Sequence, residues 1–247
     1  MYAGLDVGSR TIKLVMFDTV IVESVVTDTG VNPLQRTRQL IADKKFERLV
    51  VTGYGRHLVA PVLNSEKVTE IKAFAVGARH LFPDCHTVID IGGQDSKVIQ
   101  LSEGGEVFKF EMNDRCAAGT GKFLEIMANT LEVGITDIGE LALSANKELQ
   151  INSLCTVFAE SEVVSLIARG EDASAIALAL HKAIATRVST MVNRVGIKER
   201  VIFAGGASLN RCLARLLAEK LNTKLVIPDS PQILGALGVA ILAKEGI

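Results

Sequence analysis

Two short segments of the sequence repeat the same arrangement of aspartate, glycine and lysine. Residues Asp6–Lys13 align with Asp90–Lys97, and in each copy glycine follows the aspartate by two positions and lysine follows it by seven. A glycine-containing turn exposes backbone N–H groups and lets the main chain approach a phosphate closely. One such turn alone is also the pattern of an ordinary hairpin. Two matching turns predict a duplicated fold whose halves hold the phosphates of a nucleotide between them.

Acidic residues beside the two turns indicate a metal ion as well as a phosphate. Carboxylates repel a bare phosphate, but Mg²⁺ prefers oxygen ligands and retains several waters. We therefore expect Asp6 and Asp95 to hold Mg²⁺ through water, with Asp90 close by. Gln94 is uncharged and is suited to orient an attacking water. The candidate catalytic residues are Asp6, Gln94 and Asp95.

A third glycine-rich segment, Ala204–Ser208, joins a predicted strand to a predicted helix. Such a segment lets an adenine and ribose lie against the backbone near a helix N-terminus. Two better-known nucleotide motifs are not found. Residues Cys116–Phe123 lack the first glycine of a P-loop and the Ser/Thr after its lysine. No G-x-G-x-x-G follows the first predicted strand, so a dinucleotide site is poorly supported.

The candidate nucleotide-binding residues come from these segments and from two helices near them. For Glu160 two roles stay open: a contact to the nucleotide or its Mg²⁺ shell, and a capping or solvent-facing carboxylate. The full set is Asp6, Gly8, Ser9, Lys13, Asp90, Gly92, Gly93, Gln94, Asp95, Gly119, Thr120, Gly121, Lys122, Glu160, Gly205, Gly206, Ala207 and Asn210.

Hydrophobic patterning predicts the elements that position these residues. In each half, three strands precede an alternation of helices and strands, which indicates a mixed sheet covered by helices. The predicted strands are Tyr2–Leu5, Leu14–Phe17, Val20–Thr27, Leu49–Thr52, Thr87–Ile89, Val98–Leu101, Val107–Met112, Val201–Ala204 and Lys224–Ile227. The predicted helices are Pro33–Asp43, Val68–Leu81, Ala117–Leu131, Thr136–Ser144, Ala159–Arg169, Ala173–Val195, Leu209–Leu221 and Ile233–Lys244.

This pattern predicts an α/β protein with two lobes. We expect the first lobe to cover residues 1–83, with a C-terminal helix at 232–247 packing back on it. The second lobe covers residues 84–231 and carries the third glycine-rich segment.

Composition and charge exclude several classes of protein. Hydrophobic residues make up 48% of the 247 residues and charged residues 22%, which is typical of globular proteins. A net charge of -1 gives no general basic surface for nucleic acid or anionic membrane. We see no apolar run that approaches the roughly 18–20 residues of a membrane span, and no leader. We therefore expect a cytoplasmic protein, in which structural disulfides are uncommon.

The four cysteines then need a role other than disulfides. Cys116 is predicted to open one helix and Cys155 lies just before another, and a helix N-terminus stabilises the thiolate form that binds iron. A 4Fe–4S cluster usually takes four cysteines, which a two-fold dimer would supply at two per chain. Cys85 and Cys212 are interpreted as small buried side chains. Spacing alone leaves that same interpretation open for the first pair.

Five segments fall in the order of the motifs of the actin–hexokinase–Hsp70 superfamily. Asp6–Ser9 and Asp90–Asp95 resemble its phosphate motifs, Ala118–Gly121 its first connecting motif, Phe203–Ala207 its adenosine motif and Gly235–Gly238 its second connecting motif. The resemblance covers the whole chain. It implies two duplicated ribonuclease-H-like lobes, the actin-like ATPase fold, with a nucleotide cleft between them.

Longer matches point to one branch of that superfamily. Asn113–Leu124, Cys155–Glu162 and Thr52–Arg56 resemble the activators of 2-hydroxyacyl-CoA dehydratases, a group that includes the ATPase subunits of benzoyl-CoA reductases. The resemblance implies a homodimer with one bridging 4Fe–4S cluster, Cys116 and Cys155 as its ligands, and an oxygen-sensitive protein from an anaerobic setting. Unlike many members, this chain has Pro231–Leu234 instead of a polar stretch before the second connecting motif, which leaves the partner open. Related activase-like proteins also serve other reductases, including double-cubane cluster proteins.

We therefore expect an ATP-hydrolysing, low-potential, one-electron donor. A ferredoxin or flavodoxin would reduce it, and a cluster-containing dehydratase or reductase would accept its electron. The alternative is a cluster-free small-molecule kinase of the same superfamily, with Asp95 as general base. A third class, a nucleotide-dependent assembly or regulatory protein, needs no cysteines. For Arg56 three roles stay open: contact with the partner, relay of the nucleotide state, and simple shaping of a glycine turn.

Overall fold

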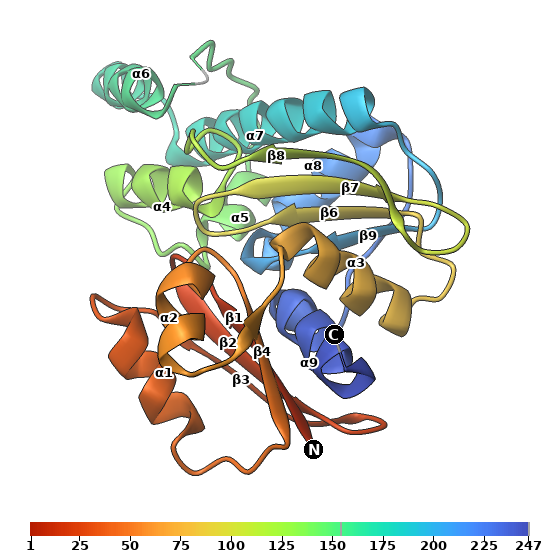
Figure 1. Cartoon of the computed structure of the whole chain (residues 1–247). Coiled ribbons are helices and arrows are strands. Elements are labelled where there is room, and N and C mark those ends of the chain that lie inside the picture. The colour runs from red at the N-terminus through yellow and green to blue at the C-terminus, as the bar shows by residue number, and fades with distance from the viewer. Residues whose placement is uncertain (154, 247) are drawn as a thin grey trace.

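The computed structural model describes residues 1–153 and 155–246 and contains two lobes, each built on a five-stranded mixed sheet (Figure 1). Residue 247, the last of the predicted C-terminal segment, lies outside the described residues.

The first sheet combines an antiparallel meander with two parallel strands. Its strands are β1 (Tyr2–Val7), β2 (Thr11–Phe17), β3 (Ile21–Asp28), β4 (Arg48–Thr52) and β5 (Glu66–Lys67), and its helices are α1 (Pro33–Ile41) and α2 (Arg56–Val62). The strand order is β3-β2-β1-β4-β5, with β4 parallel to both β1 and β5. Strands β1 and β4 are almost entirely buried, because helices cover both faces of their sheet.

The second sheet repeats the first strand for strand. Its strands are β6 (Thr87–Ile91), β7 (Ser96–Leu101), β8 (Val107–Asn113), β9 (Val201–Ala204) and β10 (Leu225–Val226). The order β10-β9-β6-β7-β8 again places three antiparallel strands beside two parallel ones. The prediction of two duplicated α/β lobes is confirmed.

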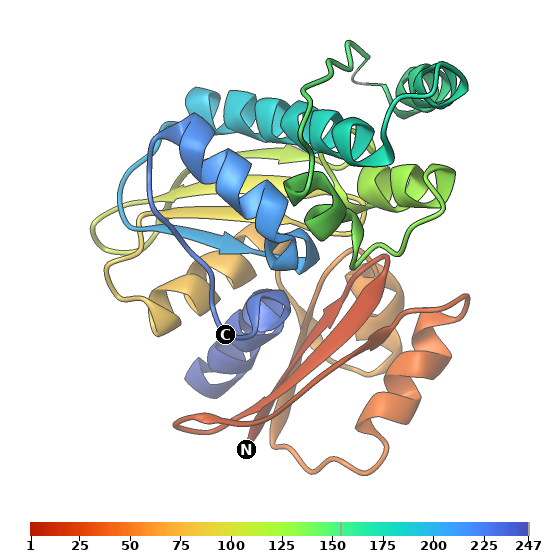
Figure 2. The ribbon, with the colours of Figure 1, turned by 180° about the vertical axis from the view of Figure 1, so that it is seen from behind.

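Helices of the second half lie on the side of its sheet that points away from the first lobe (Figure 2). They are α4 (Gly121–Thr130), α5 (Ile138–Leu143), α6 (Thr156–Ala168), α7 (Ala173–Val195) and α8 (Arg211–Leu221), with short 3₁₀ helices at Gly206–Leu209 and Pro231–Ile233. Helix α6 projects beyond the others and packs on α4 and α7, not on the sheet (Figure 2). Among the described helices α7 is long and apolar enough to cross a membrane by length and composition, which corrects the prediction that no apolar run approaches that length. Most of α7 is buried in the core of the second lobe.

Two helices between the sheets exchange partners (Figures 1 and 2). Helix α3 (Glu70–Leu81) follows the first sheet in sequence but packs on the second, whereas α9 (Leu234–Glu245) ends the chain and packs on the first. They cross at Gly77 and Gly238, where a Cβ on Gly238 would lie 1.8 Å from the backbone oxygen of Ala73. The division of the chain at residue 83 stays a prediction, since α3 associates with both halves.

Some element predictions are corrected. The helix predicted over 117–131 begins only at Gly121, because Gly119 has φ +85° and turns the chain out of the helical region. Patterning does not predict α2, which contains Pro61, or β5, which has two residues. The other predicted elements are present, with ends that differ by no more than three residues.

Candidate functional site

A cavity of about 510 Å³ lies between the two lobes and collects most of the candidate residues. Its volume is within the range of small-molecule sites. Both repeated segments contribute to its walls, so they face each other across it. The candidate residues that line it are Asp6, Gly8, Ser9, Lys13, Asp90, Gly92, Gly93, Asp95, Gly121, Gly205, Gly206, Ala207 and Asn210.

The first turn joins β1 to β2 and carries Asp6 near the end of β1. Asp6 lies opposite Lys13 in the antiparallel register, and Lys13 Nζ is 3.2 Å from Asp6 Oδ2. Gly8 closes the turn by donating its N–H to Thr11 O at 3.1 Å. A Cβ on Gly8 would lie 2.8 Å from that same oxygen, so this tight turn requires glycine.

The second turn repeats this construction between β6 and β7. Asp90 lies opposite Lys97, and Lys97 Nζ is 2.9 Å from Asp90 Oδ2. Gly92 donates its N–H to Asp95 O at 2.9 Å. The two copies differ in how deeply the lysine is buried: the side chain of Lys97 is 2% exposed and that of Lys13 is 15% exposed.

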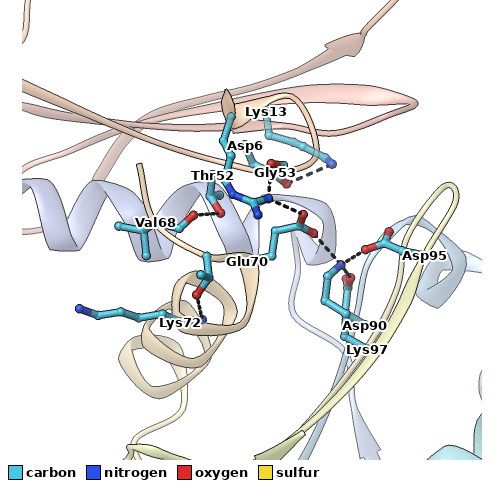
Figure 3. A network of polar contacts seen from close by, with 12 residues as sticks. Asp6, Lys13, Thr52, Gly53, Val68, Glu70, Lys72, Asp90, Asp95 and Lys97 are labelled. Atoms are coloured by element: carbon cyan, nitrogen blue, oxygen red, sulfur yellow. Dashed lines mark hydrogen bonds and ion pairs between the residues drawn. The ribbon is translucent and has the colours of Figure 1, made fainter. Parts of the chain in front are cut away.

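Three carboxylates surround the buried Lys97 (Figure 3). Its ammonium contacts Asp95 and Asp90 and lies 3.0 Å from Glu70 Oε2. Burial lowers the pKa of Lys97, but the three carboxylates outweigh burial and hold this pKa well above its ordinary value. Burial raises the pKa of both Asp90 and Glu70. Three carboxylates around one ammonium leave an excess of negative charge, which a divalent cation would offset.

The third glycine-rich segment lies directly against the second turn. Gly205 has φ +81°, and a Cβ there would lie 2.4 Å from Ile91 O and 2.6 Å from Asp90 Oδ1. Asn210 lines the cavity, but its side chain has other partners. Its Oδ1 accepts the N–H of Leu213 at 3.0 Å and so caps α8.

The other candidates lie outside the cavity. Gln94 is exposed at the tip of the second turn, and Glu160 is exposed on α6. Gly119 and Thr120 form the turn before α4, in which Thr120 Oγ1 donates to Ala117 O at 2.7 Å. The side chain of Lys122 does not line the cavity, but its backbone N–H contacts the second turn, as described below.

The start of α4 is hydrogen-bonded to the second turn. Gly121 donates its N–H to Gly92 O at 2.9 Å, and Lys122 donates its N–H to Gly93 O at 2.7 Å. N–H groups of a first helical turn have no partner within the helix. Here two of them hold the glycine turn in place.

The cysteines divide into a buried pair and an exposed pair. Cys85 and Cys212 are buried, and burial raises the pKa of these thiols to about 12 and about 11 respectively. Cys116 and Cys155 are exposed and free. Cys155 is the N-cap of α6, as predicted. The prediction that Cys116 opens a helix is wrong, because α4 begins five residues later, at Gly121.

Several residues of the cavity carry no signal in the sequence. Glu70, at the start of α3, lines the cavity and forms an ion pair with Lys97, although it belongs to none of the motifs that the sequence reveals. Arg10 and Glu125 line it from opposite lobes and form an ion pair of 3.5 Å. Such contacts join residues distant in the chain, and only their shared position in the cleft identifies them.

Comparison with known proteins gives matches over nearly the whole chain. The model of the BadF/BadG/BcrA/BcrD ATPase family matches residues 3–243. The 2-hydroxyisocaproyl-CoA dehydratase activator of Clostridioides difficile is 38% identical over 250 residues, which cover 97% of this chain and 93% of that protein. The (R)-2-hydroxyglutaryl-CoA dehydratase activating ATPase of Acidaminococcus fermentans is also 38% identical, with 97% and 95% covered. A solved structure of the C. difficile activator with bound ADPNP superposes with a TM-score of 0.92 at 37% identity, covering 100% of this chain and 95% of that one.

Proposed function

This chain belongs to the BadF/BadG/BcrA/BcrD ATPase family, and we propose that it is an ATP-hydrolysing iron–sulfur electron donor that activates a partner enzyme. In this proposal the partner is a 2-hydroxyacyl-CoA dehydratase or another cluster-containing reductase. The names of relatives at 38% identity support this choice, since they are activators of such dehydratases.

The observation that carries the proposal is the contact between the second turn and the segment that bears Cys116. Two N–H groups at the start of α4 bond the carbonyl oxygens of Gly92 and Gly93. The residues just before α4 are tied to β8, because Asn113 Nδ2 donates to Cys116 O at 2.9 Å. A shift of the turn on nucleotide exchange would therefore move α4 and change the setting of Cys116. Nucleotide drives such a shift only if ATP and ADP favour different positions of the turn.

The residues of the cavity suit a magnesium nucleotide. The N–H groups of Gly8 and Gly92 are bonded within their turns, so Ser9 and Gly93, which also line the cavity, are the turn residues that would offer backbone N–H groups to phosphates. Asp6 and Asp95 supply the carboxylate oxygens that Mg²⁺ prefers, at a place with excess negative charge. In this proposal they bind water molecules that coordinate the ion. Gln94 is the residue that would orient the attacking water. It takes that role only if closure of the cleft brings its exposed side chain inside.

The exposed cysteines suit an iron–sulfur cluster shared between two copies of the chain. Cys85 and Cys212 are buried, whereas Cys116 and Cys155 are exposed, so we propose the exposed pair as the thiolate ligands. Within residues 1–153 and 155–246, no three His, Cys, Asp or Glu side chains are placed so that they could hold one metal ion. Two exposed cysteines from each of two copies would make a four-thiolate site, and we therefore propose a homodimer. One 4Fe–4S cluster per dimer fits this donor set and supplies one-electron chemistry when bound.

The remaining parts of the proposal concern the setting. A reduced ferredoxin or flavodoxin serves as electron donor, and the protein works in an anaerobic cytoplasm. Hydrolysis of ATP makes the transfer directional, provided that the ATP and ADP states differ in their affinity for the partner.

The test is to purify the protein without oxygen and to measure iron, sulfide and the EPR spectrum. We expect about four irons per dimer, and we expect Cys116→Ser and Cys155→Ser each to lose them. Cys85→Ala and Cys212→Ala are the matched controls, since these buried cysteines should leave the iron content unchanged. A colourless protein that hydrolyses ATP, with unchanged Cys116 and Cys155 variants, would contradict the proposal. ATP consumption that depends on a small-molecule acceptor would then favour a kinase.

A further inference from the structure

The segment Thr52–Arg56 does not line the cavity, yet it packs against the first phosphate turn. Gly53 has φ +92°, and a Cβ there would lie 2.5 Å from Asp6 Oδ1. Gly55 donates its N–H to Val7 O at 2.8 Å. Glycine at position 53 therefore allows this segment, which lies outside the cavity, to touch a carboxylate that lines it.

Arg56 connects this turn to a second carboxylate. Its Nη1 donates to Gly53 O at 2.9 Å and lies 3.5 Å from Glu70 Oε1. A guanidinium presents several donors in one plane, so it can hold a carbonyl and a carboxylate at once.

Glu70 carries the connection into the cleft. It is the first residue of α3 and directly follows the N-cap Thr69, and its side chain is 12% exposed. One carboxylate oxygen faces Arg56, and the other lies 3.0 Å from Lys97 Nζ. Figure 3 shows Glu70 between Gly53 on one side and Lys97 on the other. A continuous chain of contacts, Arg56–Glu70–Lys97, thus runs from outside the cavity to the second turn.

The charges of Arg56, Glu70 and Lys97 determine how this series of contacts affects a bound nucleotide. ATP brings more negative charge to the cleft than ADP, so it attracts the Lys97 ammonium more strongly. Glu70 competes for that ammonium, and Arg56 competes for Glu70. A stronger hold of Glu70 on Lys97 therefore disfavours ATP, and Arg56 weakens that hold.

We propose that Glu70 is a positioning residue that limits how far Lys97 turns toward the terminal phosphate, and that Arg56, outside the cavity, sets the preference for ATP over ADP through it. The proposal rests on the nucleotide site of the proposed function and is independent of the iron. It gives the glycine turn before α2 a role in nucleotide discrimination.

The experiment measures the Kd of Mg·ADPNP and of Mg·ADP by calorimetry for the wild type and three variants. The ratio of the ADP Kd to the ADPNP Kd is expected to rise about threefold or more in Glu70→Gln and to fall about threefold or more in Arg56→Gln. The double variant should resemble Glu70→Gln alone, because Arg56 acts only through Glu70. Arg48→Gln is the matched control: Arg48 pairs with Glu66 in the same lobe, outside the cavity, and its loss should leave the ratio unchanged.

Additive effects in the double variant, or shifts of the same sign in both single variants, would overturn the proposal. Additivity would mean that each charge acts on the nucleotide separately. Should Glu70→Gln fail to fold, Glu70→Asp shortens the reach to Lys97, and an unchanged ratio in that variant overturns the proposal as well. A wild-type protein that binds no Mg·ADPNP would overturn the proposed function itself, and this inference with it.

Discussion

His181 is buried in α7 between two polar partners that fix its protonation state. Its Nδ1 lies 2.7 Å from Ala177 O and its Nε2 lies 2.9 Å from Asn210 Nδ2. A carbonyl oxygen accepts and an amide N–H donates, so the ring carries its proton on Nδ1 and accepts with Nε2. The ring thereby holds the Asn210 amide in the orientation that caps α8.

This arrangement predicts a loss of stability in acid. Burial lowers the pKa of His181 below its ordinary value of about 6.5. The unfolded chain therefore binds more protons as pH falls through this range, and the free energy of unfolding decreases. The contribution is complete above about pH 6.5 and is lost as pH falls toward the folded-state pKa. We expect the Tm of the wild type to fall more than that of His181→Gln, whose amide stays neutral, between about pH 7.5 and pH 5.5. Parallel Tm curves would contradict this.

Residues of the site differ in how far the sequence reveals them. The repeat around Asp6 and Asp90 predicts that both line one cleft, because the same local turn occurs twice. Glu70 has no such signal, and the segment Thr52–Arg56 draws attention to Arg56 without indicating that it pairs with Glu70, since both contacts of Glu70 join residues from other elements. Asn210 lines the cavity, as predicted. No pattern in the sequence indicates that its side chain is already hydrogen-bonded to the N-terminus of α8 and to His181.

At the scale of elements, apolar runs predict nearly all strands because the central strands of both sheets are almost entirely buried. The first residue of a helix is harder to predict from the sequence, because one residue with a positive φ can move it along the chain. Gly119 delays α4 by four residues relative to the pattern and leaves Cys116 in a loop. The packing of α3 on the sheet of the other half is not predictable from its own amphipathic pattern, which shows a buried face without showing its partner.

The crossing of α3 and α9 predicts unequal effects of two similar substitutions. Alanine gains about 1 kcal/mol of helix propensity over glycine in a helix interior. At Gly238 the new methyl meets backbone at 1.8 Å, whereas at Gly235 it meets the Phe74 ring at 2.8 Å, and a ring can turn away. We expect Gly238→Ala to lower the free energy of unfolding by about 3 kcal/mol or more, and Gly235→Ala to stay within about 1 kcal/mol of the wild type. Urea denaturation of both variants measures this, and equal effects would contradict the backbone contact.

At the scale of the whole molecule, we expect the exchange of α3 and α9 to make the two lobes unfold as one cooperative unit. The core of each lobe includes a helix from the other half of the chain, so neither sheet keeps its cover if the halves separate. The cavity lies where these lobes meet, and its walls come from both. A ligand there therefore contacts both parts of the fold at once.

The last prediction follows from this joint construction. A ligand that binds only the folded state stabilises it by about 2.7 kcal/mol at one hundred times its Kd. For a protein of this size, that free energy corresponds to a rise in Tm of about 5 to 10 °C. We expect Mg·ADPNP to raise one single calorimetric transition by this amount, because both lobes hold the nucleotide and unfold together. Lys122→Ala is the matched control: its side chain lies outside the cavity, so the same shift is expected. Two separate transitions, of which only one responds to the nucleotide, would show that the lobes unfold independently and that the exchanged helices do not couple them.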